Sequence, residues 1–209
     1  MFQTIKPLIL ASGSPRRKAL LTTLGIEFSV VVPEVDESRV AGETEETYTL
    51  RMAQLKGDAV SRTNPSAWIV SADTIVVIED RLLTKPANAD QAVQMLLLLS
   101  GREHQVRTGF CLCCLDRNVS VVRSVVSRVR FKHFDLDWAK AYTRTGEPLD
   151  KAGGYGIQGR GGVLVESLNG SYSNVVGLPL AEVVDLLSEH QVIVPVDENQ
   201  AGKDRVNKG

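Results

Sequence analysis

Two adjacent arginines stand at the predicted start of the first helix, in a position suited to binding an anion. Ser14 is a typical helix N-cap and Pro15 suits the first helical position, so Arg16 and Arg17 fall in the first turn. A helix N-terminus carries a partial positive charge, so further cations there are unfavourable unless an anion lies between them. The segment therefore predicts a phosphate-binding site. The alternative is that both arginines lie on the surface in solvent.

Asp73 is the carboxylate best placed for catalysis. It interrupts a β-prone, apolar run from Trp68 to Ile78, where an unpaired carboxylate would be unfavourable to bury. Such a group needs a partner, which would be a metal ion, a lysine or a reacting water. A carboxylate beside a divalent cation is also able to deprotonate water for attack on phosphorus. The alternative is an aspartate at a strand end that pairs with the backbone or a basic group.

Two lysines and a second carboxylate extend this set. Lys56 falls on a predicted helix and Lys85 precedes a proline, and each supplies a point charge suited to phosphate. Glu37 directly follows a predicted strand, where α/β folds tend to place ligand-binding residues. Because Asp36 and Glu37 point in different directions in an extended chain, we expect only one of them to face a site. Taken together, these charges predict a site for a polyphosphate and a divalent cation, although each lysine alone is more typical of solvated surface.

Composition limits the class of protein. The chain has 209 residues, 43% hydrophobic and 23% charged, with a formal net charge of −1. These values predict a globular protein with no general attraction to nucleic acid or to a membrane, so anion binding must be local. The first residues lack a signal-peptide pattern. One predicted strand contains all three cysteines, Cys111, Cys113 and Cys114, and their spacing suits neither a disulfide framework nor a zinc site. Buried, reduced cysteines predict a cytoplasmic protein.

The elements that must position these residues alternate between strand and helix. We expect strands at 8–11, 28–32 and 163–168, and helices at 15–24, 44–62, 89–99, 135–145 and 180–190. Residues 68–78 form a β-prone run broken by a polar insert at 71–74, and residues 105–134 read as a hairpin turning at 116–118. The glycine-dense stretch 153–162 is suited to backbone lying close to a ligand. The pattern predicts a mixed α/β fold of two lobes around a cleft, with one domain over 1–196 and a disordered polar tail at 197–209.

Eight motifs resemble, in this order, those of the Maf family of nucleoside triphosphate pyrophosphatases. They are residues 11–17 (ASGSPRR), 35–37 (VDE), 72–74 (ADT), 85–86 (KP), 99–101 (LSG), 147–153 (EPLDKAG), 156–159 (GIQG) and 177–180 (GLPL). Each motif alone is weak evidence, but eight in sequence are specific. One departure is Gly57, which follows Lys56 where alanine is common in the family and is expected to loosen that helix by about 1 kcal/mol.

The resemblance implies hydrolysis of a nucleoside triphosphate between its α and β phosphates, with a divalent cation such as magnesium or manganese. It implies that Asp73 is the proton acceptor that activates water, and that Glu37 and Asp73 lie at the metal. The implied substrate-binding residues are Ser12, Arg16, Arg17, Lys56, Thr74, Lys85 and Gln158. The implied fold is a two-lobed mixed sheet with flanking helices around a central cleft, similar to the inosine triphosphate pyrophosphatases, and the implied assembly is a homodimer.

The motifs also point to a branch of the family. Residues 154–159 and the Asp73–Thr74 pair are similar to the branch that acts on dTTP and UTP, whereas a sister branch prefers 7-methylguanosine triphosphate. Arg16, Thr74 and Gln158 match positions linked to base choice, and an amide at Gln158 is able both to donate to and to accept from a pyrimidine edge. The alternatives are a 7-methylguanosine triphosphate pyrophosphatase and a nucleotide-binding regulator of septum formation. Whether the substrate is a normal or a modified pyrimidine nucleotide stays open.

Overall fold

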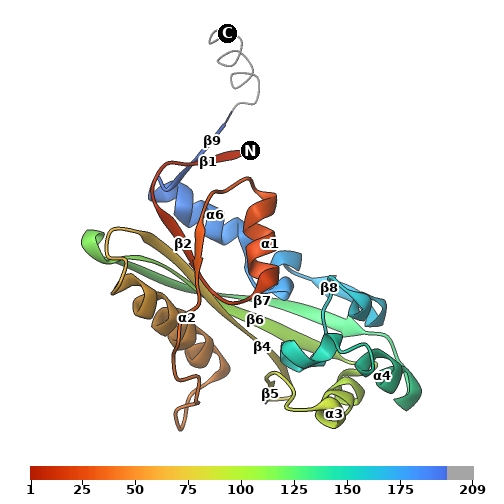
Figure 1. Ribbon diagram of the computed structural model, residues 1–209. Coiled ribbons are helices and arrows are strands. Elements are labelled where there is room, and N and C mark those ends of the chain that lie inside the picture. Colours follow the sequence, from red (N-terminus) through yellow and green to blue (C-terminus); the bar gives the residue numbers. More distant parts are fainter. Residues whose placement is uncertain (197–209) are drawn as a thin grey trace.

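The computed structural model describes residues 1–196 (Figure 1), so the predicted tail lies outside the described residues. The strands are β1 (Phe2–Thr4), β2 (Leu8–Ala11), β3 (Ser29–Val31), β4 (Trp68–Ile78), β5 (Arg81–Leu83), β6 (Glu103–Cys114), β7 (Val119–Phe131), β8 (Val165–Asn169) and β9 (Ile193–Pro195). The helices are α1 (Pro15–Thr23), α2 (Glu45–Ser61), α3 (Ala89–Leu99), α4 (Leu136–Thr143), α5 (Tyr172–Val176) and α6 (Leu180–Glu189). Short 3₁₀ turns are η1 (Leu115–Arg117), η2 (Glu147–Asp150), η3 (Ala152–Gly154) and η4 (Arg160–Leu164).

The main sheet has the strand order β3-β2-β4-β6-β7-β8, with β5 paired to β4. Strand β2 is parallel to β3 and β4, whereas β4, β6, β7 and β8 pair in antiparallel fashion, so the predicted mixed sheet is confirmed. On one side of β4, β2 pairs with residues 68–71 and β5 pairs with residues 76–78, while β6 pairs continuously on the other side. The backbone around residues 73–75 therefore borders a gap in the sheet, next to the end of β2 where α1 begins.

Helices cover both faces of this sheet (Figure 1). Alternation along the first half of β4 directs Val70 toward α1 and α6, whereas Ile69 packs with residues of α2. The second half of the strand belongs to another cluster, in which Val76 and Ile78 pack with residues of α3 and α4. Strand β4 thus runs through two parts of the core, and Asp73 lies where it passes from one to the other. A single domain over residues 1–196 stays a prediction.

Helix α2 packs very close to the sheet. A Cβ added to Gly109 of β6 would lie 2.3 Å from the carbonyl oxygen of Thr49, and one added to Gly57 would lie 3.0 Å from Ser71 Oγ. Gly57 therefore has a packing role that its weak helix propensity alone does not suggest. The close approach brings Lys56, on the same helix, within reach of β4.

The predicted burial of the cysteines is confirmed. Cys111 and Cys113 pack on the α2 face of the sheet and Cys114 on the opposite face, and all three are free thiols. Among the described residues, no helix combines the length and the apolar character that a membrane crossing would need.

Most predicted elements are present, and the differences have physical causes. The run 68–78 is one continuous strand rather than an interrupted one, because pairing with β6 extends from Ile69 to Val77. Four short elements were not predicted, because each is too short to leave a periodic pattern: β1 and β9, which form a two-stranded sheet, strand β5 and helix α5.

Candidate active site

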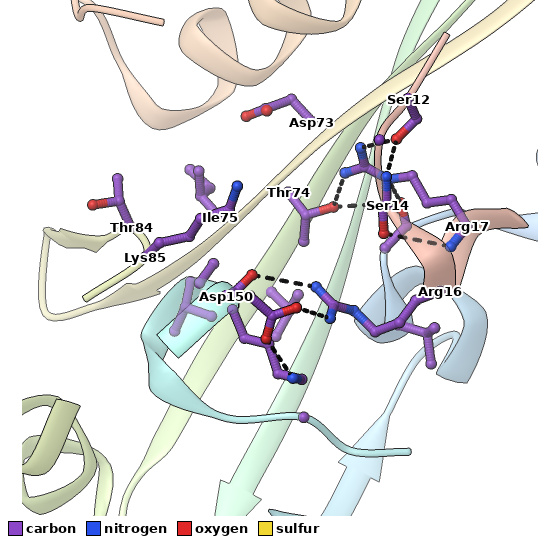
Figure 2. A pocket seen from close by; sticks show the side chains of 18 of the residues that line it. Ser12, Ser14, Arg16, Arg17, Asp73, Thr74, Ile75, Thr84, Lys85 and Asp150 are labelled. Atoms are coloured by element: carbon purple, nitrogen blue, oxygen red, sulfur yellow. Dashed lines mark hydrogen bonds and ion pairs between the residues drawn. The ribbon is translucent and has the colours of Figure 1, made fainter. Parts of the chain in front are cut away.

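A cavity of about 690 Å³ lies at the gap along β4 (Figure 2). Its lining brings together all of the residues that the sequence analysis proposed for the site: Ser12, Arg16, Arg17, Glu37, Lys56, Asp73, Thr74, Lys85 and Gln158. They come from segments spread over most of the described chain, namely the β2–α1 junction, the loop after β3, helix α2, strand β4, the loop after β5 and the segment between η3 and η4. This cavity is the cleft that the sequence pattern predicts.

Lys56 joins the two carboxylates of the site. Its Nζ lies 2.7 Å from Asp73 Oδ1 and 2.8 Å from Glu37 Oε1. The side chains of Lys56 and Asp73 are only 10% and 13% exposed, whereas that of Glu37 is 55% exposed. A lysine was one of the partners predicted for Asp73, and Lys56 is that lysine. Their ion pair lies at the mostly buried base of the cavity.

The surrounding charges favour the ionised form of Glu37. Partial burial acts to raise the pKa of Glu37, but the hydrogen bond and charge of Lys56 act in the opposite direction, followed by the charges of Lys85 and Arg17. The net result is a pKa below the ordinary value for a glutamate. Glu37 is therefore a carboxylate near neutral pH, as metal binding requires.

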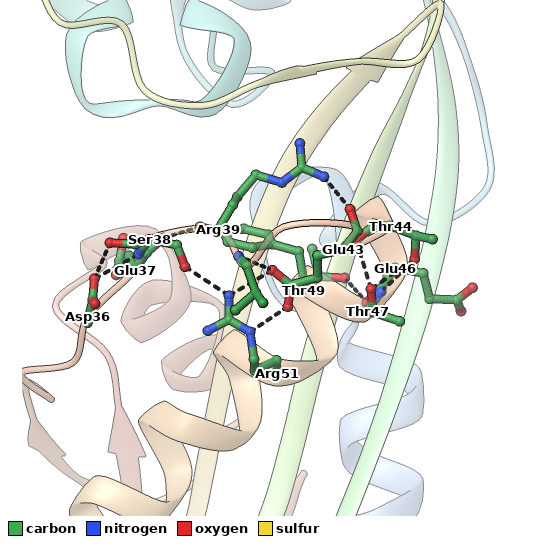
Figure 3. Close-up of polar contacts among 12 residues, drawn as sticks. Asp36, Glu37, Ser38, Arg39, Glu43, Thr44, Glu46, Thr47, Thr49 and Arg51 are labelled. Carbon is green, nitrogen blue, oxygen red and sulfur yellow. Dashed lines mark hydrogen bonds and ion pairs between the residues drawn. The ribbon is translucent and has the colours of Figure 1, made fainter.

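The loop that carries Glu37 is tied to α2 (Figure 3). Arg51 pairs with both carboxylate oxygens of Glu43 and donates a hydrogen bond to the carbonyl oxygen of Ser38 at 2.9 Å. Tyr48 Oη donates to the carbonyl oxygen of Glu37 at 3.0 Å. Because α2 also carries Lys56, one helix positions both the ammonium group and its Glu37 partner.

The expectation that only one of the neighbouring acidic residues faces the site is confirmed. Asp36 accepts hydrogen bonds from the backbone N–H and the hydroxyl of Ser38, which closes a local turn (Figure 3). Glu37 lines the cavity.

Most N–H donors of the Arg17 side chain form hydrogen bonds with other groups of the protein. Its Nε donates to the carbonyl oxygen of Gly177 at 2.7 Å, and Nη1 donates to the carbonyl oxygen of Ala72 at 2.8 Å and to Ser12 Oγ at 3.2 Å. Nη2 donates to Thr74 Oγ1 at 3.1 Å (Figure 2). Four of the five N–H groups of the guanidinium are therefore engaged. Burial lowers the pKa of Arg17, an effect that the Asp73 charge partly offsets. The side chain thus connects α1, β4 and the turn before α6, and keeps its charge and one N–H for a ligand.

Arg16 points across the cavity toward η2. Its Nη1 lies 2.8 Å from Asp150 Oδ2, and the two side chains are 25% and 59% exposed (Figure 2). Asp150 Oδ1 also accepts a hydrogen bond from Lys151 Nζ at 2.6 Å. Asp150 was not among the predicted site residues, although it lies in the family motif at residues 147–153, which is the sequence signal that could have identified it.

The oxygen donors of Glu37 and Asp73 fit a divalent cation. Their carboxylates both contact one ammonium group, so they point toward the same place at the cavity. Among residues 1–196, no cluster of three or more His, Cys, Asp or Glu side chains is suited to a metal ion. Magnesium nevertheless needs only one or two protein carboxylates, since it also takes phosphate oxygens and water. The donors therefore suit a cation that binds together with a phosphate ligand.

Comparison with known proteins assigns the family. The family model described as Maf-like protein matches residues 7–190, and the chain belongs to this family. It is 50% identical over 193 residues to the dTTP/UTP pyrophosphatase of Desulfotalea psychrophila, covering 92% of this chain and 99% of the relative. It is also 46% identical to the dTTP/UTP pyrophosphatases of Geotalea uraniireducens (90% and 96% covered) and Salmonella typhimurium (89% and 94% covered).

Among solved structures, the Staphylococcus aureus Ham1 protein aligns with 60% of this chain and 72% of its own at 13% identity, with a TM-score of 0.44. The family membership expected from the eight motifs is thus confirmed by the sequence relatives.

Proposed function

We propose that this protein is a nucleoside triphosphate pyrophosphatase that hydrolyses dTTP and UTP to the nucleoside monophosphate and pyrophosphate. The observation that carries the proposal is the Lys56–Asp73 pair beneath a cavity lined by Arg16, Arg17 and Lys85. A carboxylate of this kind suits proton abstraction from water, and the cations suit a triphosphate. The names of relatives at 46–50% identity give further support to the pyrimidine substrates.

In this proposal, Asp73 accepts the proton of a water molecule whose oxygen attacks the α-phosphorus. A new P–O bond forms, the anhydride bond between the α and β phosphates breaks, and pyrophosphate leaves with its electron pair. Lys56 holds Asp73 in place, and Lys85 stabilises the negative charge that develops on the leaving group. Arg17 contributes its charge and one N–H, while its remaining donors keep Ser12 and Thr74 in position.

Glu37 and Asp73 would hold magnesium or manganese together with phosphate oxygens. The metal ion would supply Lewis-acid polarisation and charge neutralisation at the phosphates. Lys56, which contacts both carboxylates, limits the negative charge that they present before the cation and the nucleotide bind.

Three residues that line the same cavity select the nucleotide base in this proposal: Arg16, Thr74 and Gln158. The Gln158 amide is able to pair with a uracil or thymine edge through one donor and one acceptor.

The names of the relatives do not favour the two alternatives, which are a pyrophosphatase for 7-methylguanosine triphosphate and a purely regulatory role in septum formation. A homodimer and a cytoplasmic location remain part of the proposal, the first on the family resemblance and the second on the reduced, buried cysteines.

The test is a product analysis with dTTP, UTP and 7-methylguanosine triphosphate in the presence of magnesium. We expect equal amounts of monophosphate and pyrophosphate from dTTP and UTP, and a rate at least about tenfold lower with the methylated purine. Release of single phosphate, or faster turnover of the methylated purine nucleotide, would contradict the proposal.

A further inference from the structure

The carboxylate of Glu147 holds the loop that carries Gln158. Its Oε1 accepts hydrogen bonds from Tyr142 Oη at 2.8 Å and from the backbone N–H of Gly161 at 3.1 Å. Its Oε2 accepts a hydrogen bond from the backbone N–H of Arg160 at 3.0 Å. Three donors therefore converge on one carboxylate, and two of them belong to the backbone just after Gln158.

Glycines in this loop allow its backbone to lie close to the side chains of Glu147 and Tyr142. A Cβ added to Gly159 would lie 2.6 Å from both carboxylate oxygens of Glu147, and one added to Gly161 would lie 2.5 Å from Tyr142 Oη. Tyr142 Oη in turn accepts a hydrogen bond from the backbone N–H of Gly156 at 3.1 Å. The glycine-rich stretch, which the sequence pattern relates to a ligand, thus also wraps around a protein carboxylate and its tyrosine partner.

Asp150, at the other end of η2, holds Arg16 from the opposite wall of the cavity. The ion pair of 2.8 Å joins residues 134 positions apart in the sequence. Lys151 strengthens the turn itself, since its Nζ donates to Asp150 Oδ1 and to the carbonyl oxygen of Glu147, both at 2.6 Å. One turn of four residues is therefore in contact with Arg16 through one end and with the Gln158 loop through the other.

We propose that η2 is a specificity-determining element in which Glu147 positions Gln158 and Asp150 positions Arg16 for reading the base. This inference rests on the proposed function, because it assigns to η2 the placement of two groups that select the pyrimidine. Neither carboxylate takes part in proton transfer. Both act on the geometry of the pocket, so their loss weakens discrimination between bases more than it slows the chemical step.

The test compares kcat/KM for UTP and CTP, two nucleotides that differ only in the donor and acceptor pattern of the pyrimidine edge. The variants are Glu147→Gln, which replaces one acceptor oxygen by a donor amide, and Asp150→Asn, which removes the charge that pairs with Arg16. We expect each variant to lower the UTP-to-CTP ratio by at least about tenfold, mainly through KM for UTP, while kcat for UTP changes by less than about threefold. Glu166→Gln, an exposed residue of β8, is the matched control and keeps the wild-type ratio.

Circular dichroism and thermal unfolding establish that the variants are folded. Asp150 is exposed, so its variant keeps the test decisive even if Glu147→Gln unfolds. The inference is overturned if either folded variant keeps the wild-type ratio, or if it slows UTP and CTP equally. Failure of the wild-type protein to hydrolyse UTP would instead overturn the proposed function, so the two failures are distinguishable.

Discussion

Lys56 and Asp73 form a mostly buried ion pair, with Lys56 Nζ 2.7 Å from Asp73 Oδ1, and the same ammonium group contacts Glu37 at 2.8 Å. A phosphate-binding lysine is the role expected from the sequence. The geometry adds a second role, because Lys56 compensates two carboxylates that would otherwise repel each other at the base of the cavity.

Replacing Lys56 by glutamine should therefore change the pH dependence of activity. Lys56 is the main influence that lowers the pKa of Glu37, so its removal raises that pKa, and a larger fraction of Glu37 is protonated at mildly acidic pH. We expect the acid limb of magnesium-dependent pyrophosphate release to move to higher pH. Lys85→Gln is the control, since the Lys85 charge has a smaller influence on Glu37 and should move the limb less. An unchanged limb in Lys56→Gln would contradict this assignment.

Glu37→Gln should weaken the response to magnesium without unfolding the protein. The side chain is half exposed, and its loop remains tied to α2 through Arg51 and the Tyr48 hydroxyl. We expect the magnesium concentration for half-maximal activity at saturating UTP to rise by about tenfold or more. Chelation of divalent cations should abolish the activity of the wild-type protein. A magnesium response like that of the wild type would remove Glu37 from the metal site.

Much of this organisation could be predicted from local sequence. Ser14 accepts a hydrogen bond from the Arg17 backbone N–H at 3.5 Å, and Asn88 caps α3 by accepting one from Gln91 at 2.9 Å, as their residue types indicate. Strand β2 has the predicted bounds, because its apolar run ends at a sharp change to small residues.

Contacts between distant segments could not be predicted in the same way. Nothing near Arg16 in the sequence indicates that its partner is Asp150, 134 residues further along. Similarly, the polar residues 71–74 look like a break in a strand until pairing with β6 and the contact with Lys56 satisfy them. The family motifs identified residues that line the cavity, and the structure adds the contacts that hold Arg16, Arg17 and Lys56.

The two adjacent arginines should differ in their effect on stability. Arg17→Ala removes four hydrogen bonds and leaves the carbonyl oxygens of Ala72 and Gly177 without this donor, so we expect a loss of about 3 kcal/mol in the free energy of unfolding. Arg16→Ala removes an exposed pair and should change stability by less than about 1 kcal/mol. Both should weaken UTP binding. Urea unfolding and calorimetric titration measure the two effects, and equal losses of stability would contradict the distinct roles.

His104 should make the fold sensitive to acid. Burial lowers the pKa of His104 from 6.5 to about 4, its Nε2 contacts Tyr155 Oη at 2.8 Å, and its buried Nδ1 has no hydrogen-bond partner among the described residues. Between these two pKa values the unfolded chain binds a proton that the folded protein does not. The free energy of unfolding is therefore independent of the titration of His104 above pH 6.5, and it falls by about 3 kcal/mol as the pH drops toward 4.

Urea unfolding across this pH range checks the prediction. His104→Gln should show a smaller loss of stability on acidification than the wild-type protein, because glutamine does not titrate. His133→Gln, at an exposed position, should behave like the wild type. The assignment would be wrong if both variants lost stability in parallel with the wild-type protein.

The most direct test of the account is the rate of pyrophosphate release from UTP by Asp73→Asn, measured beside the affinity for UTP. The substitution keeps the shape of the side chain but removes the proton acceptor, so we predict a rate lower by about 100-fold or more with UTP affinity within about threefold of the wild type. Asp116→Asn, at the exposed η1 turn, serves as the control and should keep the wild-type rate. A rate for Asp73→Asn equal to that of the wild type would contradict the central claim that this carboxylate activates water.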